Sequence, residues 1–361
     1  MSYIHTRYSG ARKRKRSPVI RFLLIVILIL LVILAGGAYQ LYITLLKPNT
    51  WVPDGKDHAI YIKTGSGYDD LITVLYGNGL VINRKTFEWL ANLKKLAESV
   101  KPGKYFIRAG MNNNELINLL RSGAQQPVKL IFNNLRTKDQ LAKTISSQIE
   151  ADSAEIIQLL NDTLFLRNLG YNPDNIMALF IPNTYEVYWT TDAKDFINRM
   201  FLENNNFWNA ERQKKAGEIG FSPVEVSILA SIIEKETTKV SEMPTMAGVY
   251  TNRLKYGWRL QADPTVVYAW GDFSIRRVLN IHKQIESPYN TYLNFGLPPG
   301  PICIPSIAAI DAVLNREDHN YMFFCAKDDF SGYHEFARTH EQHSFNANKY
   351  RRALDALNIK N

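Results

Sequence analysis

Cysteine is scarce in this chain of 361 residues: it occurs only at Cys303 and Cys325, and no CxxC pair is present. The sequence therefore lacks the thiolate motifs of zinc sites and thiol redox enzymes, and neither cysteine has the surroundings of a known nucleophile. In an oxidising compartment the two residues could form a disulfide, but the sequence gives no distance between them, and free buried thiols fit it at least as well. Cysteine chemistry gives no indication of function.

Several enzyme motifs are also missing. The absence of GxSxG argues against serine hydrolases with a nucleophile elbow, and the absence of GxxxxGKS/T and GxGxxG argues against nucleotide chemistry. His340 and His343 could share one helical face, so a metal site with His334 is conceivable. Their segment, HEFARTHEQH, lacks the HExxH pattern, and hydrogen bonding in a substrate groove is the favoured role. We expect neither a metal nor a cofactor.

Acidic residues are absent from residues 1–50, whereas lysine and arginine occur there eight times. The formal net charge of +9 therefore divides into +8 for this segment and +1 for all remaining residues. Binding of nucleic acid usually needs a basic surface on the folded domain. The body of the chain has no such excess, so we expect no nucleic-acid partner.

Charged residues are also absent between Arg21 and Lys47. As a helix, this stretch would span roughly 37 Å, which is enough to cross a hydrocarbon core of about 30 Å with some tilt. We therefore predict a single transmembrane helix at residues 19–46. The basic cluster RKRKR precedes it, so the positive-inside rule keeps residues 1–18 in the cytoplasm. The body is then periplasmic or extracellular, on the far side of the inner (plasma) membrane.

A cleaved signal peptide is the competing interpretation of this segment. Residues 22–34 could be its apolar core, and Ala35-Gly36-Gly37 would be a poor cleavage site. Hydrophobic residues continue as far as Leu46, which favours an uncleaved anchor.

The remaining sequence predicts an α+β protein in two parts. Residues 47–56 are polar and contain proline, as linkers do. Residues 57–125 combine short alternating segments with segments of helical spacing, and Asn83 and Asn112 are placed to cap two of the helices. Residues 126–361 are expected to form a larger mixed α+β domain.

Within this larger domain, three segments can be interpreted individually. The aromatic segment at 180–189 is expected to be irregular or extended, and residues 196–216 are expected to form one helix. Pro223 suits a first helical turn, and neither glycine nor proline interrupts the chain again before Pro244.

The last of these helices carries the strongest candidate for proton chemistry. At about 100° per residue, Glu236 shares a face with Leu229, Ile232 and Ile233, whereas Glu234 points the opposite way. A carboxyl group facing apolar side chains loses hydration, so its pKa rises toward the range of a general acid. We predict that Glu236 is this acid.

Two alternatives remain open for Glu236. It could pair with an arginine, such as Arg253 or Arg259, and have a structural role alone. It could also be one of two carboxylates in a hydrolytic glycosidase. The candidate partners are Glu186, Asp263 and Glu286, and Asp263 could instead be the N-cap of a helix.

Seven motifs in fixed order resemble the MltG, or YceG-like, family of endolytic murein transglycosylases. They are PGKYFIRAGM at 102–111, FIPNTYEVYW at 180–189, LASIIEKET at 229–237, TNRL at 251–254, RLQADPTVVY at 259–268, SPYNTYLNFGLPPGPI at 287–302 and HEF…T…H ending at His343. The resemblance runs from the apolar segment nearly to the C-terminus, and it implies a LysM-like module at 57–125 and a YceG-like catalytic domain at 126–361.

The resemblance also implies a reaction and a site. The catalytic glutamate corresponds to the second one of EKET, which is Glu236. The expected substrate-binding residues are Asn252, Arg253, Gln261, Asp263, Thr265, Asn290, Tyr292, His334 and His343.

The implied enzyme cleaves the β-1,4 bond between N-acetylmuramic acid and N-acetylglucosamine inside nascent glycan strands, and it leaves 1,6-anhydro ends without using water. The family further implies peptidoglycan synthases and the elongation or division machinery as partners. A hydrolytic muramidase and a noncatalytic wall-binding scaffold are the alternatives.

Overall fold

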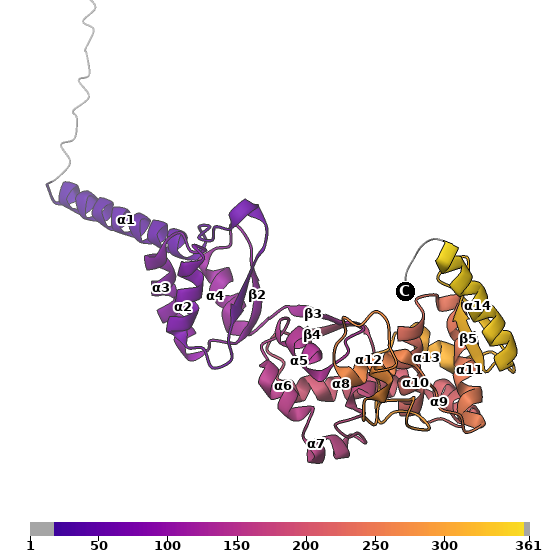
Figure 1. The fold of residues 1–361 in the computed structure, drawn as a ribbon. Coiled ribbons are helices and arrows are strands. Elements are labelled where there is room, and N and C mark those ends of the chain that lie inside the picture. The colour runs from indigo at the N-terminus through magenta and orange to yellow at the C-terminus, as the bar shows by residue number, and fades with distance from the viewer. Residues whose placement is uncertain (1–17, 357–361) are drawn as a thin grey trace, which may run out of the picture. The chain divides into compact units, whose positions relative to one another are not determined.

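The computed structural model describes residues 18–356, which form two compact units divided between Gln126 and Pro127 (Figure 1). Helices are mixed with three antiparallel two-stranded sheets in this part of the chain, which confirms the predicted α+β class.

The described chain begins with helix α1 (Pro18–Leu45), which is long and apolar enough to cross a bilayer. Its side chains are exposed from Pro18 to Tyr42. Because a helix satisfies its backbone hydrogen bonds internally, such an apolar surface is suited to lipid. The predicted N-terminal apolar helix is confirmed, and it fits an anchor as well as a signal sequence.

The rest of the first unit packs helices against one small sheet. Strand β1 (His58–Ile62) pairs with β2 (Gly103–Ile107), and both contribute alternate residues to the core. As predicted, Asn83 and Asn112 cap two helices by accepting backbone hydrogen bonds from Thr86 and Glu115. The helices of this unit are α2 (Tyr68–Gly77), α3 (Arg84–Leu93) and α4 (Asn113–Ser122), with 3₁₀ turns η1 (Pro53–Gly55) and η2 (Leu96–Glu98).

The segment expected to be a linker is built into this unit. Asn49 and Thr50 are buried, and Val52 belongs to the hydrophobic core. The Asn49 amide donates to the Asn113 side chain at 2.6 Å, and Asn113 donates to the carbonyl of Thr44, in the last turn of α1. The polar composition of this segment is typical of a linker, but its polar groups form their hydrogen bonds inside the unit instead of with water.

The second unit begins with a sheet covered by helices. Strand β3 (Pro127–Phe132) pairs with β4 (Asn183–Tyr188), so the aromatic segment at 180–189 is extended for most of its length. Phe132 stacks on Tyr185, which places these aromatic rings in the core. The surrounding helices are α5 (Lys138–Ser146), α6 (Ser153–Leu159), α7 (Thr163–Asn168), η3 (Ile176–Leu179) and α8 (Ala193–Phe207).

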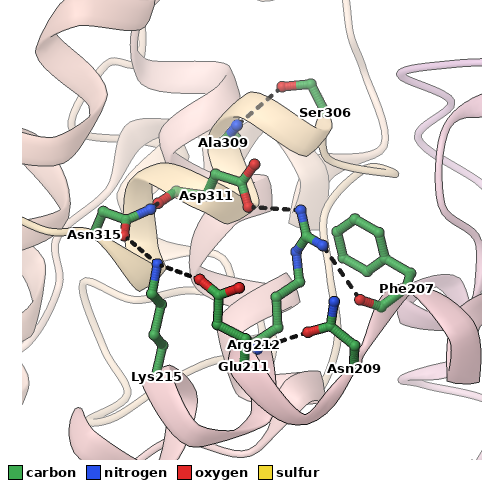
Figure 2. Close-up of polar contacts among 9 residues, drawn as sticks. All are labelled: Phe207, Asn209, Glu211, Arg212, Lys215, Ser306, Ala309, Asp311 and Asn315. Carbon is green, nitrogen blue, oxygen red and sulfur yellow. Dashed lines mark hydrogen bonds and ion pairs between the residues drawn. The ribbon is translucent and has the colours of Figure 1, made fainter.

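The single helix expected at 196–216 is in fact two, α8 and α9 (Ala210–Glu218). Trp208 leaves the helical conformation with ψ of 59°, and the Asn209 side chain then caps α9. Figure 2 shows that polar contacts fix α9 to α13 (Ile307–Leu314): Arg212 pairs with Asp311 at 3.2 Å. In the sequence, the helical spacing of apolar residues continues across the break between α8 and α9. Only Asn209, a good N-cap, indicated that a second helix begins there.

Helix α10 (Pro223–Glu236) lies in the middle of a second core in this unit. It packs against α11 (Met243–Lys255), α12 (Asp263–Trp270) and α13, and its residues from Val226 to Ile233 are all buried or nearly so. The helix is shorter than the sequence allowed, because Thr237 takes an extended conformation. Glu236 is thereby placed on its last turn.

The C-terminal part of the chain closes over the end of this core. Strands β5 (Phe323–Ala326) and β6 (His334–Ala337) form a hairpin, and α14 (His340–Ala356) packs against both. Cys303 and Cys325 are free thiols, so the disulfide alternative is not realised. The remaining short elements are η4 (Val240–Glu242) and η5 (His282–Gln284).

Candidate active site

Glu236 lines a cavity of about 350 Å³ at the end of α10. Its neighbours on the helix, Leu229, Ile232 and Ile233, are fully buried, so the helix holds the carboxyl group against the core, as its periodicity predicts. The cavity is lined by Glu236, Arg253, Gln261, Asp263, Tyr292, Phe323, Phe324, His340 and His343.

Burial is the main cause that raises the pKa of Glu236, and the nearby carboxylate of Asp263 acts in the same direction. The position at a helix C-terminus also favours the protonated form, because the last carbonyl groups carry partial negative charge. A hydrogen bond of 2.7 Å from the Tyr250 hydroxyl to Glu236 Oε1 and the charge of Arg253 act in the opposite direction. The resulting pKa of Glu236 is about 7, which suits a general acid at neutral pH.

Glu234 lies apart from this cavity. Its carboxylate accepts hydrogen bonds from the hydroxyl and the backbone of Ser306, the residue that caps α13. This contact gives Glu234 a structural role. Glu234 and Glu236 face different partners, as expected.

The structural pairing considered for Glu236 is not found. Arg253 donates from Nε to the carbonyl of Met322 at 2.8 Å and from Nη1 to the carbonyl of Leu260. Arg259 lies instead over the ring of Phe295. No ion pair of Glu236 occurs within residues 18–356, so its carboxyl group stays available for chemistry.

Asp263 is the second carboxyl group of the cavity. It is the first residue of α12 and not its N-cap, which is Ala262 without a side-chain bond. The Tyr292 hydroxyl donates to Asp263 Oδ1, and this bond raises the pKa of Tyr292 together with burial. The other two candidate partners of Glu236, Glu186 and Glu286, do not line the cavity.

Gln261 reaches the cavity from a backbone in the left-handed region, with φ of 50°. This conformation is unfavourable for a residue with a side chain, and it is maintained here because Gln261 N donates to the Thr291 carbonyl at 3.0 Å. Thr265 and Thr291, joined at 2.8 Å through their hydroxyl groups, fix the same loop. Strained backbone held by its surroundings is common at functional sites.

Four residues expected in the groove do not line this cavity, and their role in binding the substrate stays a prediction. Thr265 and Asn290 are fully buried and have their polar groups satisfied within loops, Asn290 by donating to the carbonyls of Lys283 and Ile285. These bonds shape the loops that carry Asp263 and Tyr292.

The other two residues outside the cavity are Asn252 and His334. The Asn252 amide donates to the carbonyls of His319 and Tyr321. His334 pairs with Glu242 at 2.9 Å. The polar side chains of Asn252 and His334 thus join segments that are distant in sequence. Such contacts cannot be predicted from the spacing of residues along the chain.

The histidines of the cavity come from α14. His343 stacks on Phe323 with a separation of 5.3 Å between ring centres, and its Nδ1 is buried without a hydrogen-bond partner. Burial lowers the pKa of His343, so the ring is neutral at pH 7. Because His334 is held elsewhere by Glu242, the conceivable metal site of three histidines does not form, and no other cluster suited to a metal occurs among the described residues.

Three residues of the site were missed by the sequence analysis: Tyr250, Phe323 and Phe324. Tyr250 had a usable signal, because it precedes Arg253 by three positions on one helix and so shares its face. The two phenylalanines belong to a hairpin that only the tertiary fold brings to α10.

Comparison with known proteins shows which family the chain resembles over most of its length. A model of the YceG-like family matches residues 60–349. An endolytic murein transglycosylase of Bacillus subtilis (strain 168) is 29% identical over 337 residues, covering 88% of this chain and 91% of that protein. One from Streptococcus pneumoniae R6 is 27% identical over 348 residues, and the match covers 86% of this chain but 62% of the longer pneumococcal protein.

A solved structure shares the fold. The crystal structure of a YceG-like protein from Listeria monocytogenes has a TM-score of 0.54 and 27% identity, covering 80% of this chain and 98% of that one. Because the family model matches most of its length, this chain belongs to the YceG-like family.

Proposed function

We propose that the chain is a membrane-anchored endolytic lytic transglycosylase that cleaves the β-1,4 bond between N-acetylmuramic acid and N-acetylglucosamine in peptidoglycan. The observation that supports this proposal most strongly is the carboxyl group of Glu236, whose pKa is raised to about 7 inside a polar cavity. Relatives named endolytic murein transglycosylases support peptidoglycan as the substrate, and the bond is the one that the family resemblance implies.

In the first step, protonated Glu236 donates its proton to the glycosidic oxygen as the bond from C1 to that oxygen breaks. Positive charge develops on the muramic acid ring. The hydroxyl of Tyr250, 2.7 Å from Glu236 Oε1, stabilises the carboxylate that forms. The departing strand leaves with a free hydroxyl group.

In the second step, the Glu236 carboxylate removes the proton from the C6 hydroxyl of the same muramic acid. The C6 oxygen then bonds to C1 and closes a 1,6-anhydro ring. Glu236 is protonated again, so the cycle is complete without water. Proximity of this hydroxyl to C1 supplies much of the rate.

The other cavity residues have supporting roles in the proposal. Tyr292, Gln261 and His343 offer hydrogen-bonding groups to sugar hydroxyls, and the unpartnered Nδ1 of His343 is the clearest example. Phe323 and Phe324 present flat apolar surfaces, which suit a sugar ring. Arg253 contributes its charge, and its bonds from Nε and Nη1 to backbone carbonyls hold it in place.

A hydrolytic muramidase is the second candidate, because Asp263 lines the same cavity as Glu236. In that reaction Asp263 would act as the second carboxylate. A noncatalytic scaffold is less well supported, since a scaffold gains nothing from a carboxyl group whose pKa lies near neutrality.

The proposal assigns α1 as an uncleaved anchor, with residues 1–18 in the cytoplasm and the body periplasmic or extracellular. The anchor would keep the enzyme near newly made strands and so limit their length. Residues 57–125 would be a LysM-like module that contacts glycan, residues 126–361 the catalytic domain, and wall synthases and the elongation or division machinery the protein partners.

The proposed function is tested by incubating the full-length protein in detergent with uncrosslinked glycan strands and measuring product masses. Anhydro ends, lighter by one water than reducing ends, are the expected products. Glu236→Gln is expected to abolish cleavage, and Glu234→Gln, on the same helix, is the matched control that retains it. Cleavage by Glu236→Gln, or loss in the control variant alone, would refute the assignment of Glu236.

A further inference from the structure

A second cavity, of about 310 Å³, also contains Glu236 and Asp263. Its other lining residues differ from those of the first cavity, and four of these residues carry a positive charge. These residues are Arg136, Lys235, Arg276 and Arg277, and we call this space the basic cavity. The two carboxyl groups thus lie where the two cavities adjoin.

The four cations of the basic cavity outnumber its two acidic side chains. None of them takes part in an ion pair anywhere in residues 18–356. Lys235 donates to the side chain of Asn134, and Arg136 lies over the ring of Phe273 at 4.6 Å. Both contacts are with neutral groups, so they orient the cations without cancelling their charge.

Like charges are held close together in the basic cavity. Burial lowers the pKa of Lys235, and the neighbouring charge of Arg136 acts in the same direction, whereas Cys303 and Glu234 act against it. The two carboxyl groups of the walls compensate only in part, because four cations face two acidic side chains. An anion entering the cavity would relieve this repulsion, so the electrostatics favour a negatively charged ligand.

The first cavity offers a contrasting surface. The residues that it does not share with the basic cavity are aromatic, amide and histidine side chains, with the single exception of Arg253, which donates from Nε and Nη1 to backbone carbonyls. A neutral sugar suits the first cavity. In the basic cavity, a neutral sugar would leave the four cations without an anionic partner.

We propose that the basic cavity binds a carboxylate of the peptide stem that a peptidoglycan strand carries on muramic acid. This inference rests on the proposed function, which places muramic acid at Glu236. The stem is attached to that sugar, so it must leave the site through a space next to Glu236, and the basic cavity is such a space. Guanidinium groups bind carboxylates through paired hydrogen bonds, which suits Arg276 and Arg277.

The test compares two substrates with the same strand length and bulk. Uncrosslinked strands are cleaved either unmodified or after carbodiimide and ammonia have converted the stem carboxylates to amides. We expect the full-length enzyme in detergent to have a kcat/KM about tenfold higher for the unmodified strands, with the difference mainly in KM.

Arg276→Ala and Arg277→Ala are expected to reduce this preference about two- to fivefold each, and the double variant is expected to lose it. Both arginines are exposed, so the fold should be retained, and thermal unfolding verifies this. Lys255→Ala, which removes an exposed positive charge of the same unit outside both cavities, is the matched control and should keep the wild-type preference.

Equal cleavage of the two substrates by the wild type, or equal losses on both substrates in the arginine variants, would overturn the inference while leaving the proposed function intact. If the wild type produces anhydro ends from neither substrate, the proposed function itself fails. The two failures are therefore distinguished in one experiment.

Discussion

Replacement of Tyr250 by phenylalanine tests the origin of the Glu236 pKa. The ring of Tyr250 is fully buried, so phenylalanine keeps the packing and removes only the hydroxyl that donates to Glu236 at 2.7 Å. A hydrogen bond to a charged group contributes about 1.5 to 3 kcal/mol. This bond favours the carboxylate, so its loss should raise the pKa of Glu236 by about one to two units above the present value.

The kinetic consequence follows from the role of the acid. The first step needs protonated Glu236, so kcat/KM of the wild type should fall as pH rises through about 7. In Tyr250→Phe this alkaline limb should move to higher pH by about one to two units. The maximal rate should fall as well, because the carboxylate formed in the first step has lost its hydrogen-bond donor.

The measurement is a pH profile of kcat/KM on uncrosslinked strands for the two proteins. Thermal unfolding at each pH excludes a loss of structure. An alkaline limb that stays in place, or that moves to lower pH, would refute the reasoning that this hydrogen bond lowers the pKa of Glu236.

Three further predictions concern the electrostatics and the packing of the second unit. Asp263→Asn removes a charge that raises the pKa of Glu236, so the alkaline limb should move to lower pH while anhydro products persist; loss of all cleavage would favour the muramidase. Above pH 7, Glu236→Gln should be more stable than the wild type by at most about 3 kcal/mol, since the raised pKa means that native stability is lost as pH rises from 4.5 to about 7. Urea unfolding at pH 5 and pH 8 measures the difference, which should fall to about 1 kcal/mol or less at pH 5. Gly300→Ala should destabilise the protein by about 2 to 3 kcal/mol or more, because its Cβ would lie 1.9 Å from the carbonyl oxygen of Asp174. Gly217→Ala, which has open space around its Cβ, should be neutral or slightly stabilising, and thermal unfolding of the two variants measures the difference.

The features predicted best from the sequence are those set by neighbouring residues. The helix period separated Glu236 from Glu234, because side-chain direction in a helix depends only on position along it. Asn83 and Asn112 were identified as caps for the same reason, since a cap bonds to a backbone group two or three residues away.

The features predicted least well depend on contacts between distant segments. Asn252 and Arg253 adjoin in sequence, but only Arg253 lines the cavity, because the Asn252 amide is used by carbonyl groups of the loop before β5. Phe323 reaches the site through the C-terminal hairpin, and no local pattern announces that packing. The buried polar residues of the segment 47–56 looked solvated for a similar reason: the partners of Asn49 lie at the starts of α3 and α4, and Thr50 donates to the carbonyls of Arg108 and Met111 after β2.

The central claim is that a hydroxyl group of the substrate, and not water, attacks C1 after Glu236 donates its proton. Cleavage of uncrosslinked strands in water enriched in heavy oxygen, followed by mass spectrometry of the new ends, tests it most directly. The account predicts anhydro ends that contain no heavy oxygen in the wild type and no cleavage in Glu236→Gln. Heavy oxygen at the new ends would contradict the account and identify a hydrolase.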